Sequence, residues 1–158
     1  MRKSEFMEVT VEHLGGVKFE VAAREHRVLC DQPRDNGGSD SGMTPPEFLL
    51  ASLGTCAAYY AAEYLKIRKL MVPNLTVKVT AEKALRPARL ATFRIDVTAP
   101  GLDEKHELGL QRAAKACLIH NTLLARPGIE VIVNQSPARM NVETQSWNET
   151  AKSSLHAN

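Results

Sequence analysis

The stretch PPEFLLASLGTC, residues 45–56, starts the element that decides the fold. Thr44 precedes it and Glu47 follows three positions later, which is the capping-box pattern of a helix N-terminus. Proline in the first turn supports the same start. Apolar residues then occupy most sides of the helix through Ala62. Because a helix that is apolar all round must be buried on all sides, we predict a long helix over Pro45–Leu70, covered by a sheet and also by a partner.

The first forty residues have the alternation that is typical of β-strands. Apolar residues alternate with polar ones over Met7–Val11 and again over Val17–Val21. Gly15-Gly16 lies between these runs and signals a turn, so the two runs predict a hairpin. A third short strand is expected over His26–Cys30, before a loop rich in glycine, aspartate and proline.

Downstream of the long helix, two further alternating runs predict half-buried strands over Leu75–Thr80 and Thr92–Val97. A second helix is expected over Asp103–Leu124, and a last strand over Ile129–Val133. The order βββ-α-ββ-α-β makes the expected fold α+β.

Length and composition indicate one globular domain over residues 1–134, followed by a polar C-terminal tail, residues 135–158, that we expect to be flexible. Hydrophobic residues make up 44% of the chain and charged residues 24%, which is ordinary for a globular protein. The net charge of +2 is too small to indicate a nucleic-acid or membrane-surface partner. The N-terminus lacks the apolar segment of a secretory signal, and no stretch approaches a membrane span, so a cytoplasmic location is expected.

The chain has three cysteines, and an odd number in a reducing compartment is not a disulfide framework. None forms a CxxC pair or zinc-ligand spacing with a histidine, so no structural metal is expected. A helical cysteine is usually a small buried residue, and Cys30, on a short strand, has the weakest case for reactivity. Cys56 and Cys117, however, each lie on an expected helix with polar residues one turn later. Two such helices, packed together, could bring both thiols into one pocket.

A reactive thiol needs a basic group or hydrogen-bond donors nearby, because the thiolate is the nucleophile. Glu47 does not fill this role directly, since nine helical positions put it on the face opposite Cys56 and roughly 13 Å away along the axis. Glu47 is therefore interpreted first as a cap and second as a site residue. The basic candidates by residue type are Lys18, Arg24, His26 and Arg27.

Three segments together resemble the OsmC-like family, which is related to the organic hydroperoxide resistance proteins. The segments are GGSDSGMTPPEFLLASLGTC (residues 37–56), AAKACLIHNTLL (residues 113–124) and GIEVIV (residues 128–133). The resemblance runs from Val9 to Val133 and includes two cysteine motifs in the same order. REHRVLCDQP, residues 24–33, leading into the glycine-rich loop, is similar to the OsmC-like branch rather than to the hydroperoxide resistance branch.

The resemblance implies an intertwined homodimer whose active sites lie at the interface and whose central helices are buried between the sheets of both chains. It also implies a thiol peroxidase. We expect it to act on organic hydroperoxides, with hydrogen peroxide a poorer substrate, because the expected pocket walls are apolar. Cys56 would attack the peroxide and become a sulfenic acid, and Cys117 would condense with it to a disulfide. An external dithiol, lipoylated or small, would restore the enzyme by exchange, without a metal or bound cofactor. Glu47 is the acid typical of the OsmC-like pattern.

Three departures from the hydroperoxide resistance branch concern the site. In that branch an arginine follows the glycine pair of the first hairpin and pairs with the acid, whereas Val17 stands there in this chain. Arg24, which we take as the site candidate, or Lys18 would have to replace it. The acid of that branch stands at the position of Pro46, and Leu118 occupies the place where proline usually follows the second cysteine.

Two other functions stay open on these residues. The missing arginine fits a dimer that holds a small apolar or acyl ligand and does no redox chemistry. A redox sensor, whose disulfide changes its contacts with a partner protein, would use the same two thiols.

Overall fold

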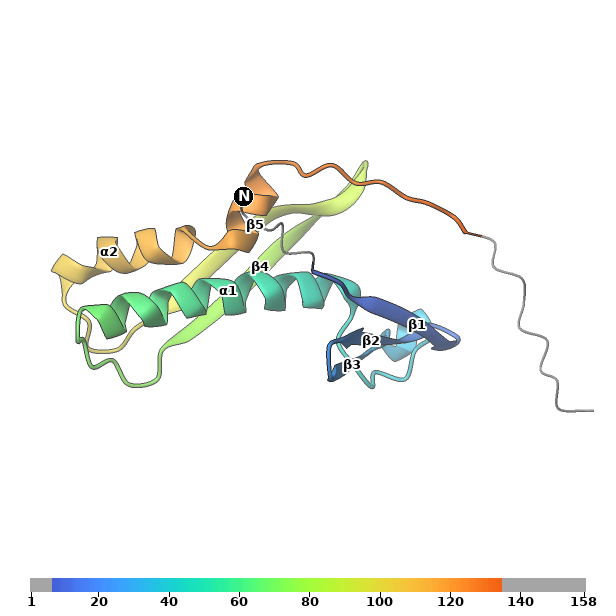
Figure 1. Ribbon diagram of the computed structural model, residues 1–158, viewed down its shortest axis with the longest axis horizontal. Coiled ribbons are helices and arrows are strands. Elements are labelled where there is room, and N and C mark those ends of the chain that lie inside the picture. The colour runs from blue at the N-terminus through green and yellow to red at the C-terminus, as the bar shows by residue number, and fades with distance from the viewer. Residues whose placement is uncertain (1–6, 135–158) are drawn as a thin grey trace, which may run out of the picture. The chain divides into compact units, whose positions relative to one another are not determined.

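The computed structural model describes residues 7–134 of the 158-residue chain. The strands form two antiparallel sheets, one with the order β1-β2-β3 and one of β4-β5, and the fold is α+β (Figure 1). All the helices and strands belong to one compact unit that ends at Pro127. In chain order they are β1 (Thr10–Gly15), β2 (Lys18–Ala23), β3 (His26–Cys30), the 3-10 helix η1 (Arg34–Asn36), α1 (Pro45–Ile67), β4 (Thr76–Leu85), β5 (Ala88–Thr98), α2 (Glu104–Lys115) and α3 (Leu118–Leu124).

The N-terminal sheet confirms the predicted hairpin and third strand. β1 and β2 pair with Val11 opposite Val21. Gly15 and Gly16 turn the chain with φ of 110° and 57°, a region that glycine enters without steric cost. Arg24 makes the next turn with φ of 55°, so its side chain stands on a tight β2–β3 connection.

The loop over residues 31–43 folds closely against the end of β3. A Cβ atom on Gly38 would meet the backbone of Gln32, and one on Gly42 would meet the backbone of Leu29. These two glycines therefore let the loop return along the strand that it leaves, and the chain then enters α1.

Helix α1 begins as predicted, with the Thr44 N–H donating to Glu47 Oε2 at 2.7 Å in a capping box. It ends at Ile67, three residues earlier than predicted, because Lys69 adopts a left-handed φ of 55°. The hairpin β4–β5 packs against α1, and its strands extend beyond the runs expected from alternation.

The core lies on one face of α1, where small and branched apolar residues recur at every fourth position. α2 lies beside α1 and contributes apolar residues from its own inner face (Figure 1). The buried hydrophobic members from the two helices are Leu53, Ala57, Ala61 and Leu65 of α1 and Leu110 and Ala114 of α2.

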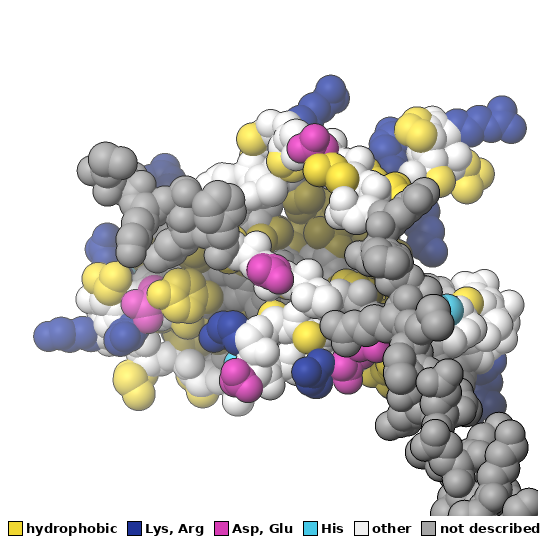
Figure 2. All heavy atoms as spheres, turned by 45° about the vertical axis from the view of Figure 1, so that its right-hand side comes forward, with side chains coloured by type: hydrophobic (Ala, Val, Ile, Leu, Met, Phe, Trp, Pro, Cys, Tyr) yellow, Lys and Arg dark blue, Asp and Glu magenta, His cyan; other side chains and the backbone are white. Residues whose placement is uncertain are grey.

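The other face of α1 is open in the single chain. Thr55 and Ala62 are exposed, the Tyr59 side chain is 63% exposed and Ile67 is 73% exposed. Other hydrophobic side chains also reach the surface, as the space-filling view shows (Figure 2). Burial on all sides, which the apolar pattern predicts, thus requires an element beyond the residues that the structure describes.

The prediction of one continuous helix over Asp103–Leu124 is wrong. α2 ends at Lys115, and Cys117 has an extended backbone with φ of −70° and ψ of 146° before α3 begins. The helical spacing of apolar residues continues across the break. Such spacing does not reveal a single residue whose backbone is non-helical. The Cys117 sulfur caps the new N-terminus and offsets the loss of helical hydrogen bonds.

The predicted strand over Ile129–Val133 is absent from the structure. Residues 128–134 carry no strand, and the side chains of Ile129, Val131 and Val133 are 84–86% exposed. Alternation shows that a segment suits a strand, but a strand forms only when a neighbour accepts and donates its backbone hydrogen bonds. No such pairing is made by this segment within the described residues.

Candidate functional site

Two free thiols meet where α1 contacts α3. Cys56 lies in the middle of α1 and is half-buried, and Cys117 stands at the N-cap of α3 and is fully buried. The Cys56 thiol lies near enough to Cys117 to raise the pKa of the Cys117 thiol. The structure therefore brings together the two cysteines that the sequence singles out.

Burial is the largest influence on Cys117 and raises the pKa of its thiol. The backbone N–H of His120 acts in the opposite direction, since it donates to Cys117 Sγ at 3.3 Å and favours the thiolate. The neighbouring Cys56 adds to the upward shift. Cys117 is thus a protonated thiol at neutral pH, held in place by the helix that it caps.

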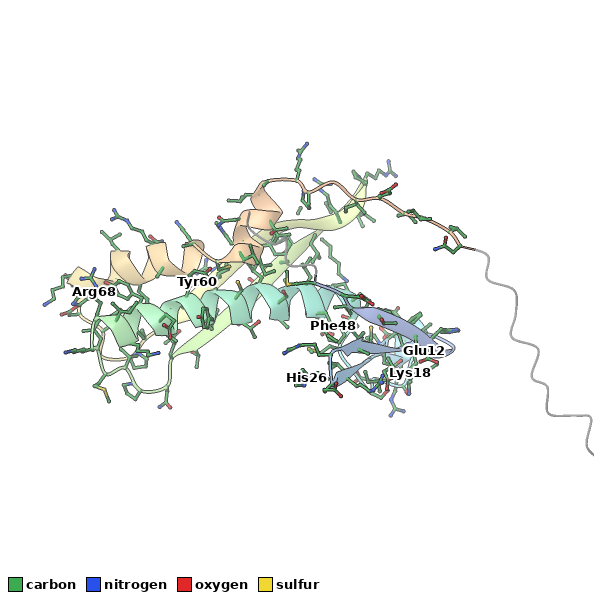
Figure 3. All side chains as sticks on the ribbon, viewed as in Figure 1. Glu12, Lys18, His26, Phe48, Tyr60 and Arg68 are labelled. Carbon is green, nitrogen blue, oxygen red and sulfur yellow. The ribbon has the colours of Figure 1, made fainter. Side chains whose placement is uncertain are left out.

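Cys56 has a different setting. It occupies the helix one turn before Tyr60, which Figure 3 labels on α1. The rings of Tyr59 and Tyr60 pack edge to face, with centroids 5.6 Å apart. Cys56 is thus the more accessible of the two thiols and has an aromatic pair one turn away.

Glu47 serves the helix N-terminus. Its carboxylate accepts hydrogen bonds from the Thr44 N–H at 2.7 Å and from Thr44 Oγ1 at 2.8 Å. Both donors lower the pKa of Glu47. No hydrogen bond joins Glu47 to Cys56 within residues 7–134, in agreement with the helix arithmetic.

The basic candidates belong to the N-terminal sheet, where Figure 3 labels Lys18 and His26. Lys18 donates to Ser39 Oγ at 3.0 Å, and Arg27 is ion-paired with Glu20 at 2.7 Å. Arg24 is exposed on its turn. Within the described part of the chain, no lysine, arginine or histidine side chain hydrogen-bonds to either thiol.

Asp31 is a buried carboxylate that the sequence reading missed. It is 1% exposed and accepts hydrogen bonds from the N–H and hydroxyl groups of Ser39 and Ser41 and from the Gln32 N–H. These donors, Ser41 foremost, hold the pKa of Asp31 well below its usual range, although burial opposes them. Lys18 Nζ lies 3.9 Å away. An aspartate followed by a serine- and glycine-rich loop was the available signal, because aspartate commonly closes such turns.

A cavity of about 1500 Å³ is lined by helical neighbours of the two cysteines, although neither cysteine lines it itself. Leu53 lines it from α1, three positions before Cys56, and His120 lines it from α3, three positions after Cys117. Phe93 and Ile95 face it from β5. The cavity is therefore a mixed polar and apolar space that includes residues of α1 and α3 close in sequence to the two cysteines.

The described residues contain neither a group of side chains that could hold a metal ion nor a helix that could span a membrane. No group of three or more His, Cys, Asp and Glu side chains within residues 7–134 could hold a metal ion. Over the same residues, no helix has the length and apolar character required to cross a bilayer.

The fold is similar to the folds of several solved structures. The chain is 20% identical to a candidate osmotic stress induced and detoxification response protein from Psychrobacter arcticus 273-4, with a TM-score of 0.68, covering 77% of this chain and 91% of that one. It is 15% identical to an OsmC-like protein from Mycoplasma pneumoniae, with a TM-score of 0.63 and coverage of 78% and 90%. An organic hydroperoxide resistance protein OsmC from Legionella pneumophila, described as a predicted redox protein and regulator of sulfide bond formation, is also 15% identical, with a TM-score of 0.57 and coverage of 78% and 93%.

The TM-scores establish a shared fold. Comparison with curated protein sequences gives no significant match. The family model for OsmC-like proteins matches residues 38–133, which include α1, both thiols and the hairpin β4–β5. The chain belongs to the OsmC-like protein family.

Proposed function

We propose that the protein is a thiol-dependent peroxidase that reduces organic hydroperoxides. The observation that supports this proposal most directly is that two free thiols on neighbouring helices lie close together. Cys56 is half-buried and Cys117 is fully buried. The Cys56 thiolate attacks the peroxide O–O bond, so that Cys56 becomes a sulfenic acid and the alcohol leaves. Cys117 then attacks Cys56, a disulfide forms and water leaves.

The environments of the two thiols support this division of roles. Cys117 is fully buried, and burial raises the pKa of its thiol, so it is a poor first nucleophile. Cys56 is partly exposed and can meet an incoming peroxide. Once Cys56 is oxidised, the neighbouring Cys117 removes the sulfenic acid before a second peroxide reaches it.

The reducing half of the cycle uses an external dithiol. A lipoyl group or a small dithiol attacks the Cys56–Cys117 disulfide by thiol–disulfide exchange and leaves oxidised. The protein needs no resident cofactor in this scheme, because its own sulfur atoms carry the electrons between dithiol and peroxide.

The walls of the cavity support an organic substrate over hydrogen peroxide. Leucine, phenylalanine and isoleucine side chains line a large part of it, and an alkyl or aryl group would be buried against them. The Legionella pneumophila neighbour, and another from Elizabethkingia anophelis, are organic hydroperoxide resistance proteins by description.

The proposal includes a homodimer with sites at its interface. One face of α1 is covered within the chain, whereas Tyr59 and Ile67 on the rest of the helix are exposed. Burying such apolar surface against a second copy is favourable at about 25 cal/mol per Å². Arg24, on its exposed turn, is proposed to reach Cys56 of the other copy and to stabilise the thiolate.

The test is a Cys56→Ser variant supplied with tert-butyl hydroperoxide and a dithiol. We expect turnover to be lost, while Cys30→Ala, a buried cysteine on β3, retains it as the matched control. Turnover by Cys56→Ser at the rate of the parent protein would refute the proposal.

The cavity also favours one alternative, a dimer that binds a small apolar or acyl ligand without redox chemistry. Mass spectrometry after mild peroxide treatment separates the two functions. A Cys56–Cys117 disulfide supports the peroxidase, and two unmodified thiols support the binding protein. Fast disulfide formation with negligible dithiol-driven turnover would indicate a redox sensor.

A further inference from the structure

The turn between β4 and β5 carries three exposed cations. They are Lys83, Arg86 and Arg89, and none of them forms an ion pair within residues 7–134. The Arg89 guanidinium is held at the turn, since it donates to the Pro87 carbonyl at 3.3 Å. Glu82 is the one acid in the sequence between residues 82 and 90. The turn is therefore locally basic, a feature that the net charge of +2 for the whole chain does not show.

A β-bulge turns an apolar side chain outward at the same place. The register of the hairpin shifts just before Lys83. Before the shift the odd-numbered residues of β4 are the partly buried ones, whereas after it Ala84 is partly buried instead. Leu85 therefore points outward and is 87% exposed, and Pro87 and Ala88 beside it are exposed as well. The bulge thus gives the turn an apolar apex with cations on either side of it.

The hairpin turn is not covered by the helices of its own chain. In the view of Figure 1 it projects past α3. Charged residues at the end of a hairpin protect its edges from pairing with other chains, but that role calls for polar side chains and does not require a leucine at the apex. A single exposed leucine is ordinary on a protein surface. The informative feature is the combination of an apolar apex with flanking lysine and arginine.

This combination suits a lipid bilayer with an anionic surface. Proteins that bind at the membrane interface bury apolar side chains at the boundary of headgroups and acyl chains, while lysine and arginine attract the anionic headgroups. A nucleic-acid site would instead align its cations along a track and place polar or aromatic side chains between them. Here leucine, proline and alanine stand between the cations. The charge and the apolar apex together favour the bilayer.

We propose that the hairpin tip, residues 83–89, binds the surface of an anionic lipid bilayer. Leu85 enters the boundary between headgroups and acyl chains, and Lys83, Arg86 and Arg89 contact the anionic headgroups. The binding is peripheral, and no helix within the described residues has the length and apolar character to cross a bilayer. This inference does not rest on the proposed peroxidase function, because neither Cys56 nor Cys117 belongs to the hairpin.

The test is co-sedimentation of the full chain with lipid vesicles. We expect binding to vesicles of phosphatidylcholine and phosphatidylglycerol in equal parts, and little binding to phosphatidylcholine alone. Binding should weaken as salt is added, because salt screens the attraction between exposed cations and the surface. The triple variant Lys83→Gln, Arg86→Gln and Arg89→Gln should bind the anionic vesicles on the order of 10²-fold more weakly, about fivefold for each cation lost.

A second triple variant is the matched control. Arg27→Gln, Lys66→Gln and Lys105→Gln remove the same total charge from residues that are ion-paired in the structure, outside the hairpin. This variant should bind the vesicles within about twofold of the parent, because these cations already have acidic partners. Equal losses in the two triple variants would overturn the inference, since binding would then follow net charge and not the hairpin tip.

The role of the apex is tested separately. Leu85→Ser should weaken binding on the order of tenfold and leave its salt dependence unchanged, because the cations remain. In Leu85→Trp, made with Trp147→Phe so that one tryptophan remains, vesicles should shift the emission to shorter wavelength, and brominated acyl chains should quench it. Emission that is already shielded before vesicles are added would place the apex against a second copy of the chain and overturn the inference.

Two further results would overturn the inference: no binding of the parent to anionic vesicles at low salt, or binding of the tip to duplex DNA without binding to vesicles. Circular dichroism checks that each variant is folded. If the triple variant of the tip fails to fold, Arg86→Gln alone repeats the test, with an expected loss of about fivefold.

Discussion

The Cys56 thiol on α1 lies against the Cys117 sulfur that caps α3, although the two residues are far apart in the sequence. The break between α2 and α3 gives the Cys117 sulfur its capping role, because a continuous helix would have no N-terminus at this position. The end of α2, the N-cap of α3 and the position of the Cys117 sulfur are thus one structural feature.

Replacing Cys117 with serine should keep the fold and stop the cycle halfway. Serine is a favoured N-cap residue and can accept the His120 N–H in place of sulfur. Cys56 should still be oxidised once, but its sulfenic acid has no neighbour to condense with and should proceed to sulfinic acid under excess peroxide. Mass spectrometry of peroxide-treated protein checks this. Resistance to over-oxidation equal to that of the parent would show that Cys117 does not resolve Cys56.

Arg24→Asn should slow the oxidation of Cys56. Asparagine tolerates the positive φ of 55° at this turn, so the backbone is kept while the cation is lost. A cation beside a thiolate favours the reactive form, and its loss should lower the rate about tenfold. Stopped-flow measurement with an organic hydroperoxide gives the rate. Arg27→Gln, which removes a cation paired with Glu20 on the same sheet, is the control, and equal rates in all three proteins would exclude Arg24.

Asp31 should make the fold sensitive to acid. Hydrogen bonds from Ser41 and Ser39 lower the pKa of Asp31 in the folded state. The contribution of this carboxylate to stability is therefore complete above the ordinary carboxyl pKa of about 3.9 and is lost as pH falls below it. Asp31→Asn should lower Tm at neutral pH and flatten the fall of Tm in acid.

Thermal unfolding between neutral pH and strong acid measures both effects. Asp35→Asn, in the exposed 3-10 helix of the same loop, is the matched control and should follow the parent curve. An acid limb that is equally steep in Asp31→Asn would assign the sensitivity to other carboxylates.

Gly109→Ala should destabilise the protein, although alanine is the better helix former. A Cβ atom at this position of α2 would meet the hydroxyl and ring of Tyr64 on α1. The Tyr64 hydroxyl is itself held by His106 Nδ1 at 3.1 Å, so it cannot move aside freely. The gain in helix propensity of about 1 kcal/mol should be outweighed by overpacking, for a net loss of about 1–3 kcal/mol.

A double-mutant cycle with Tyr64→Ala tests the cause of that loss. If the clash is responsible, Gly109→Ala should cost little or become favourable once the Tyr64 ring is gone, and the two changes should not add. Equal costs in both backgrounds, from denaturant unfolding, would show that Tyr64 is not the obstacle.

Local patterns predicted much of this fold because the interactions involved are local. Thr44 and Glu47 cap α1 within one turn of each other, and Gly15-Gly16 turns the first hairpin by backbone freedom alone. The extension of α1 to Leu70 and the continuation of the second helix through Cys117 were wrong. In each case one residue has a non-helical backbone angle, φ of Lys69 or ψ of Cys117, although the apolar side chains keep their helical spacing.

Only part of the candidate site could be predicted from the sequence. The resemblance points to Cys56 and Cys117, and the rise and rotation per helical residue separate Glu47 from Cys56 on sequence grounds alone. Asp31 and the buried Nδ1 of His120, which has no hydrogen-bond partner among the described residues, were not anticipated, because a carboxylate or an imidazole shows its hydrogen-bond partners only in three dimensions.

The sequence alone therefore determined where helices and turns begin, since capping and glycine geometry act over three or four residues. Tertiary structure alone decided which thiol is buried, which polar atoms are left unpaired and that α1 is covered on one face only. The strand expected over Ile129–Val133 belongs to the same class, because its hydrogen bonds need a neighbour. Burial and strand pairing depend on contacts between residues distant in the chain. The spacing of apolar residues along the sequence does not show which distant residues make these contacts.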